Sequence, residues 1–106
     1  MNRILVVIEH WDNQERYRED FWSYETNRYA CTSVSDAKAI VAKRKAEIMA
    51  IAKQEADVKY EELHRPGDQE YIDGISFEWP GCCSPFDGLK YDRFTWRYQE
   101  LEVIGS

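Results

Sequence analysis

One long segment repeats apolar residues at helical spacing, and it constrains the fold more than any other feature of the chain. Between Ser33 and Leu63 the apolar side chains recur at i, i+3, i+4 and i+7, which places them on one face of a helix. They are Ala37, Ile40, Val41, Ile48, Ile51, Ala52 and Val58. Of the 15 aromatic residues only Tyr60 lies in this segment. We therefore expect one helix that braces an aromatic-rich sheet.

The ends of this helix carry recognisable signals. Ser33 and Asp36 form a pair that resembles a capping box, and Ser35 is a competing cap. Residues 64–68 (His-Arg-Pro-Gly-Asp) contain a helix-breaking Pro-Gly pair. The apolar periodicity weakens past Glu55, where we expect a bend or a second short helix.

The charge of the segment changes sign along its length. Residues 36–53 carry five basic and two acidic side chains, a balance of +3, whereas residues 54–79 have a balance of −6. This order opposes the helix macrodipole, so local helix stability does not explain it. Arg44 and Glu55 interrupt the apolar stripe. Because an unpaired buried charge is costly, each should reach solvent or find a partner.

Four other regions have the composition of strands. Residues 3–9 are rich in β-branched side chains and should lie near the centre of the sheet, and 21–32, 71–79 and 91–104 follow. The last of them changes the parity of its apolar residues, which predicts a bulge near Gln99-Glu100. Polar residues 12–20 and the Pro- and Gly-containing residues 80–88 are expected loops.

These elements predict one α+β domain over residues 1–106. Its order is β–β–α–β–β, an antiparallel sheet of about four strands with one long helix packed on one face. The net charge of −6 disfavours a generic binder of nucleic acid or anionic membrane and favours a basic partner. No segment is long enough to cross a bilayer, and residues 4–8 are too short for a signal-peptide core. We expect a soluble, cytoplasmic protein.

The cysteines do not form a recognisable framework. Cys31, Cys82 and Cys83 are odd in number, and the adjacent pair lacks the spacing of a zinc knuckle. We expect Cys31 in the core, the other two in a loop, and neither metal nor cofactor. A small thiol or metal protein, in which Cys82 or Cys83 works with His10 or His64, is kept as an alternative.

Catalytic motifs are absent from the sequence, which contains no phosphate-binding glycine loop and no metalloprotease or hydrolase signature. We therefore predict a protein that is not an enzyme. A second alternative is a single-stranded nucleic-acid binder that uses Arg93, Trp96, Arg97 and Tyr98 as a stacking platform. We prefer the interpretation that these rings fill the core, because a small sheet needs large side chains.

The loop that follows Trp79 is unusually apolar. Phe86 lies between chain-breaking residues, so its ring could anchor a protein interface. It could equally fold back over one end of the core, and the sequence leaves both interpretations open.

The chain also resembles one genre of proteins in its layout. The run from Cys31 to Ala37 (CTSVSDA) joins a strand to a capped, Ala-rich helix, and two further strands follow within about a hundred acidic, aromatic-rich residues. This layout resembles small phage-encoded proteins, some of which are anti-CRISPR or other anti-defence inhibitors. The resemblance covers most of the chain and transfers no functional residue. It implies a protein that occludes a partner surface or a nucleic-acid channel.

We therefore predict a non-enzymatic protein–protein binding module that inhibits a host defence complex in the host cytoplasm. Its partner would be a basic protein surface, such as a nucleic-acid-binding channel, and self-association stays open. The expected partner-binding residues are an acidic surface and an apolar loop: Glu61, Glu62, Asp68, Glu70 and Asp73, with Cys82, Cys83 and Phe86. Such an inhibitor needs these carboxylates in one continuous outer patch.

Overall fold

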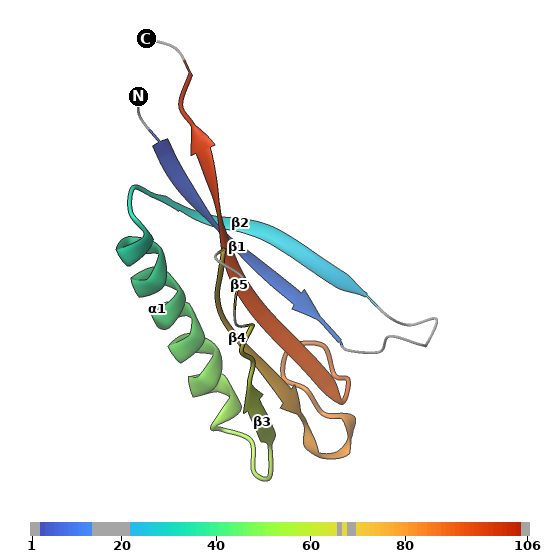
Figure 1. Cartoon of the computed structure of the whole chain (residues 1–106). Helices are drawn as coiled ribbons and strands as arrows, with labels where there is room; N and C mark the ends of the chain where they lie inside the picture. Colours follow the sequence, from blue (N-terminus) through green and yellow to red (C-terminus); the bar gives the residue numbers. More distant parts are fainter. Residues whose placement is uncertain (1–2, 14–21, 66, 68–69, 105–106) are drawn as a thin grey trace.

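The computed structural model describes residues 3–13, 22–65, 67 and 70–104. Their elements are β1 (Arg3–Asp12), β2 (Ser23–Cys31), α1 (Val34–Ala52), β3 (Lys59–Glu62), β4 (Tyr71–Glu78) and β5 (Tyr91–Glu102), with a short 3-10 turn at Pro80–Cys82. The strands form one antiparallel sheet in the order β2-β1-β5-β4-β3, and α1 lies along one face of it (Figure 1). The predicted α+β fold is confirmed, with five strands in place of four.

The helix is shorter than the sequence pattern predicted. Its start is confirmed, because the Ser33 hydroxyl accepts a hydrogen bond from the Asp36 backbone N–H at 3.1 Å. It ends at Ala52, and the chain then turns through Asp57, whose φ of 63° is left-handed. The predicted bend or second helix is wrong, since residues 59–62 pair with β4 as edge strand β3. The acidic residues past Ala52 are therefore not helical, and their charge does not oppose the helix dipole.

The pairing of β1 with β5 fixes which side chains face the helix. Its register runs without a shift from Arg3 opposite Glu102 to Asp12 opposite Arg93, so the predicted bulge at Gln99-Glu100 is wrong. Trp96 faces α1, on what we call the helix face, and Leu101 points to the opposite, open face. Since this end of β5 runs past the helix (Figure 1), Leu101 has no core to enter. The register shifts lie instead in the β1–β2 and β4–β5 pairs.

Large aromatic side chains fill the space between the helix and the sheet, as predicted. Phe77, Trp79, Phe94 and Trp96 are all buried there, and Cys31 packs against the cluster. The aliphatic part of the core consists of Val7, Ala37, Val41, Ile48, Ala52 and Ile75. Burial of each such side chain contributes roughly 1.5–3 kcal/mol, so this cluster is the main source of stability.

A carboxylate lies within this apolar layer. Glu9 of β1 is only 4% exposed, and it accepts hydrogen bonds from Arg44 Nε of α1 at 2.6 Å and from Trp96 Nε1 of β5 at 2.9 Å. Arg28 of β2 adds a third donor at 3.2 Å. Burial raises the pKa of Glu9, but these hydrogen bonds and the two positive charges outweigh it and hold the pKa below its usual value. The expectation that Arg44 finds a partner is confirmed, and the contact joins four elements.

Removal of this charge should destabilise the fold far more than removal of a surface ion pair. We expect Glu9→Gln to lower the free energy of unfolding by ~3 kcal/mol, because it leaves Arg44 without its buried partner. Glu100→Gln is the matched control, since Glu100 pairs with Arg3 at 3.1 Å on the surface and its loss should cost under ~1 kcal/mol. Urea denaturation of both variants measures the difference. Equal losses in the two variants would contradict a structural role for Glu9.

Candidate interaction surfaces

The predicted acidic surface is divided in the structure. Glu62 and Asp73 both bind the ammonium group of Lys45, at 3.1 and 3.0 Å. Glu61 precedes Glu62 on β3 and so points to the opposite face of the sheet. Glu70 is exposed ahead of β4, and Asp68 lies outside the described residues. The described carboxylates therefore do not form the continuous patch that the sequence interpretation required.

The apolar loop is folded against the protein. The ring of Phe86 makes edge-to-face contacts with Trp79 and Phe94, whose centroids lie 5.8 and 5.2 Å from its own. The structure agrees with the second interpretation of Phe86, in which its ring covers one end of the core. Cys82 and Cys83 are both exposed on the adjoining turn, and the Cys83 thiol donates to the Gly81 carbonyl at 3.2 Å.

A second buried carboxylate holds this loop in place. Asp92 of β5 has no exposed surface and accepts hydrogen bonds from Trp79 Nε1 at 2.7 Å, from Trp11 Nε1 at 3.1 Å and from the Ser84 hydroxyl. Burial raises the pKa of Asp92 to about 7, and the neighbouring charge of Asp87 adds to this against the lowering effect of the hydrogen bonds. Asp92 is not among the site residues predicted from the sequence. The sequence pattern could have identified this residue, because Asp92 alternates with Phe94 and Trp96 and therefore lies on the same apolar face of β5.

The open face carries a chain of charged side chains. His10 lies between two carboxylates, with Nδ1 3.2 Å from Glu25 and Nε2 3.2 Å from Asp12. Arg93 binds Asp12 at 2.9 Å, and Arg97 lies 3.7 Å from Glu25. A pocket of about 200 Å³ beside them is also lined by Arg65, Tyr71, Thr95 and Trp96.

This arrangement separates the residues of the proposed stacking platform. Trp96 is buried on the helix face, where it donates to Glu9, whereas Arg97 lies on the open face. Arg93 is held by Asp12. Trp96 therefore does not present a joint surface to a base together with Arg93 and Arg97.

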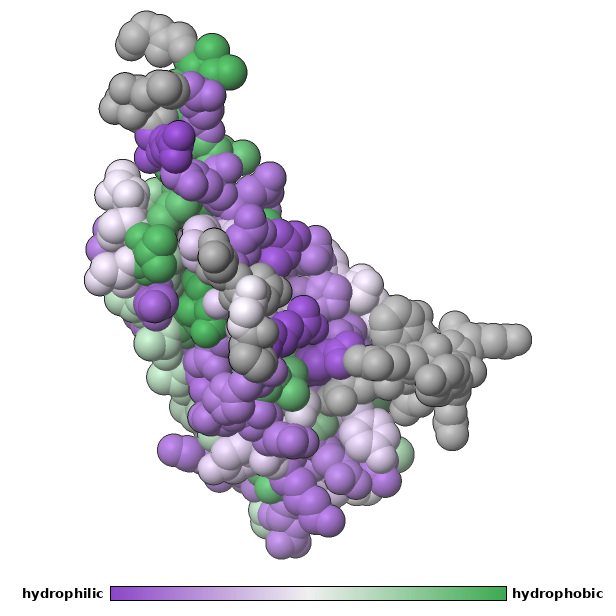
Figure 2. Space-filling model, viewed as in Figure 1, coloured by the Kyte–Doolittle hydropathy of each residue, from purple (hydrophilic) through white to green (hydrophobic). Residues whose placement is uncertain are grey.

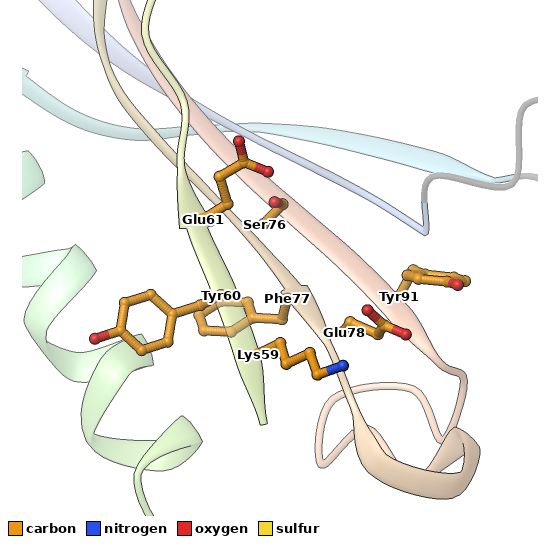
Figure 3. A pocket seen from close by; sticks show the side chains of 7 residues that line it. All are labelled: Lys59, Tyr60, Glu61, Ser76, Phe77, Glu78 and Tyr91. Carbon is orange, nitrogen blue, oxygen red and sulfur yellow. The ribbon is translucent and has the colours of Figure 1, made fainter. Parts of the chain in front are cut away.

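The edge strand β3 borders a groove. All four of its residues are exposed, and a hollow of about 270 Å³ beside them is lined by Lys59, Tyr60, Glu61, Ser76, Phe77, Glu78 and Tyr91. In Figure 3 the ring of Tyr60 is directed toward α1, away from Tyr91. Lys59 and Glu61 share the open face because they are two residues apart. The ring of Tyr60 thus lies on the helix face of β3, and the opposite charges of Lys59 and Glu61 lie on its open face.

Exposed apolar side chains gather at the other end of the molecule. Eight large hydrophobic residues are exposed in the described part of the chain, and five of them belong to this end. They are Tyr29, Val34, Leu101, Val103 and Ile104, which we call the end patch. Leu101 pairs with Ile4, and the next residue of β1, Leu5, pairs with Cys31 near the start of α1. In Figure 1 the ends of β1 and β5 project here beyond α1.

Two further observations concern membranes and metals. No helix among the described residues has an apolar stretch long enough to cross a bilayer. Over the same residues, no three His, Cys, Asp or Glu side chains come together in a group that could hold a metal ion.

The raised pKa of Asp92 predicts a pH-dependent stability. Between about pH 4 and about pH 7 the folded protein keeps a proton that the unfolded chain releases, so the free energy of unfolding should fall as pH rises. The total change is at most ~4 kcal/mol, and it levels off above pH 7. Asp92→Asn should flatten this part of the profile, whereas Asp57→Asn, at an exposed aspartate, should retain it. Denaturant titrations at half-unit pH steps test this, and an unchanged slope in Asp92→Asn would refute it.

The chain matched no protein-family model, no curated protein and no solved structure. Its own contacts and surfaces are therefore the basis on which a function is proposed.

Proposed function

We propose that the chain is a non-enzymatic protein-binding module and that the end patch is its docking surface. The observation that carries this proposal is the concentration of five of the eight exposed large hydrophobic side chains at one end of the molecule. Figure 2 shows hydrophobic side chains at the upper end, over the ends of β1 and β5, with hydrophilic side chains between them. Exposed apolar side chains gathered at one end of a protein are typical of interaction sites, because leaving them in water is unfavourable.

A partner that docks on the end patch would bury side chains that are now exposed to water. Ile104 is 89% exposed and Val103 44%, so a partner that covers them gains about 25 cal/mol per Å² of apolar area taken from water. Charged side chains lie among these apolar residues, among them Glu100, which pairs with Arg3. Protein interfaces commonly combine apolar and charged groups.

We extend the proposal to the biological role. The layout of the chain supports an inhibitor of a host defence complex, encoded by a phage and active in the host cytoplasm. Because the acidic patch is divided, this role rests on the apolar end patch and not on a continuous acidic surface. Glu61 and Glu70 stay at the surface and would steer association with a basic partner. Phe86 is withdrawn into the core, so the end patch takes the anchoring role that the sequence analysis gave to the loop.

Introducing charged residues into the end patch should abolish capture of the partner. We expect immobilised wild-type protein to retain a distinct partner from a host lysate, and Val103→Lys/Ile104→Lys to lose it, since each lysine must be desolvated on docking. Ile51→Lys is the matched control, because Ile51 is similarly exposed on α1 and is not part of the end patch. It should retain the partner. Quantitative mass spectrometry of the three eluates is the measurement.

Two outcomes would overturn the proposal. One is capture of the same protein by the double variant at wild-type yield. The other is the absence of any protein that wild type and Ile51→Lys retain in common. Circular dichroism of each variant establishes that the fold is intact.

A further inference from the structure

β3 is the last strand of the described sheet and lies at the opposite end of the molecule from the end patch. Its backbone groups have a defined direction. The Leu63 N–H donates to the Gly74 carbonyl at 2.9 Å, in the same register that pairs Lys59 with Glu78. Alternate residues of an antiparallel strand bond to the same neighbour. The backbone groups of Lys59 and Glu61 therefore point to β4, and those of Tyr60 and Glu62 point outward from the sheet.

The side chains of this edge are available for contacts. Tyr60 is 57% exposed, the largest exposed fraction of any described aromatic ring apart from Tyr24. Lys59 and Glu61 are exposed on the open face, and neither forms an ion pair with another described residue. Free edges are normally blocked by charge. Here the two charges have opposite signs and stand two residues apart.

This spacing makes the edge complementary to itself. When two identical strands pair antiparallel about a two-fold axis, the outward backbone groups meet only if the axis passes through one of the four residues of β3. An axis at Lys59, Glu61 or Glu62 places like charges directly opposite each other. An axis at Tyr60 places Lys59 opposite Glu61 of the second copy, twice. Opposite charges stabilise a cross-strand pair and like charges destabilise it, so one register is selected.

We propose that two copies of this chain associate through β3, antiparallel and with the two-fold axis at Tyr60, to form one continuous sheet. In this register the two Tyr60 residues exchange backbone hydrogen bonds. Lys59 and Glu61 occupy non-hydrogen-bonded positions, where side chains lie closest. Because β3 has four residues, the interface is small and the dimer weak.

Charge reversal and its rescue test the register. Sedimentation velocity from about 10 µM to about 1 mM should reveal a reversible dimer of the wild-type chain. Lys59→Glu and Glu61→Lys should each raise the dimer dissociation constant about tenfold or more, because each creates two like-charge pairs. The double variant Lys59→Glu/Glu61→Lys should restore it. Lys38→Glu and Glu102→Lys, which make the same charge changes at exposed sites elsewhere, should dimerise as wild type does.

Three results would contradict the proposed dimer. A wild-type chain that stays monomeric throughout the range overturns the proposal. So does a double variant that dimerises no better than the single variants, or single variants that dimerise as well as the controls. None of these results bears on the end patch, which contains no residue of β3.

A disulfide gives an independent geometric test. Directly opposed residues that exchange hydrogen bonds have Cα atoms about 5.5 Å apart, which a disulfide can span. In a background of Cys82→Ser/Cys83→Ser, Tyr60→Cys should therefore form a covalent dimer under mild oxidation. Glu61→Cys should not, since the two copies of Glu61 are offset along the strands. Equal cross-linking at both positions would refute the register.

Discussion

A negative charge held between the helix and the sheet fixes how the two layers of this protein meet. Glu9 can stay ionised there only while Arg44, Arg28 and Trp96 surround it. These partners come from α1, β2 and β5, so one carboxylate sets the rotation of the helix, the position of the edge strand and the register of the central strands. Apolar burial supplies most of the stability, but it is non-directional and would tolerate several alignments. The directional bonds to Glu9 select among them.

Each face of the sheet has both enclosed and exposed carboxylates. On the helix face Glu9, Asp73 and Asp92 are enclosed by their hydrogen-bond partners, whereas the side chain of Glu62 is 55% exposed. On the open face Asp12 is buried beside Arg93, whereas Glu61 is exposed. The elements packed around each carboxylate decide whether it is enclosed, and acidity along the chain does not. The −6 charge is therefore distributed over surfaces of different character.

Sequence reasoning predicted what depends on local pattern. The cap at Ser33, the aromatic core and the long strands all have signals within a few residues, and the structure contains them. Strand β3 has no such signal, because four residues with three charges form a strand only where β4 offers a partner edge. The prediction of the surface sites failed for the same reason, because it depended on contacts between distant parts of the chain. That Lys45 would bind Glu62 and Asp73 depends on where α1 ends and which way the chain returns, and neither is encoded near those carboxylates.

Asp92 has a consequence for how this protein can be observed. Its carboxyl group accepts hydrogen bonds from the indoles of Trp11 and Trp79, two of the four tryptophans in the chain. A charge that appears or disappears beside an indole changes its emission, so these rings act as a built-in optical probe of the buried proton. Fluorescence can thereby follow the packing of the loop after Trp79 in the intact, unlabelled molecule.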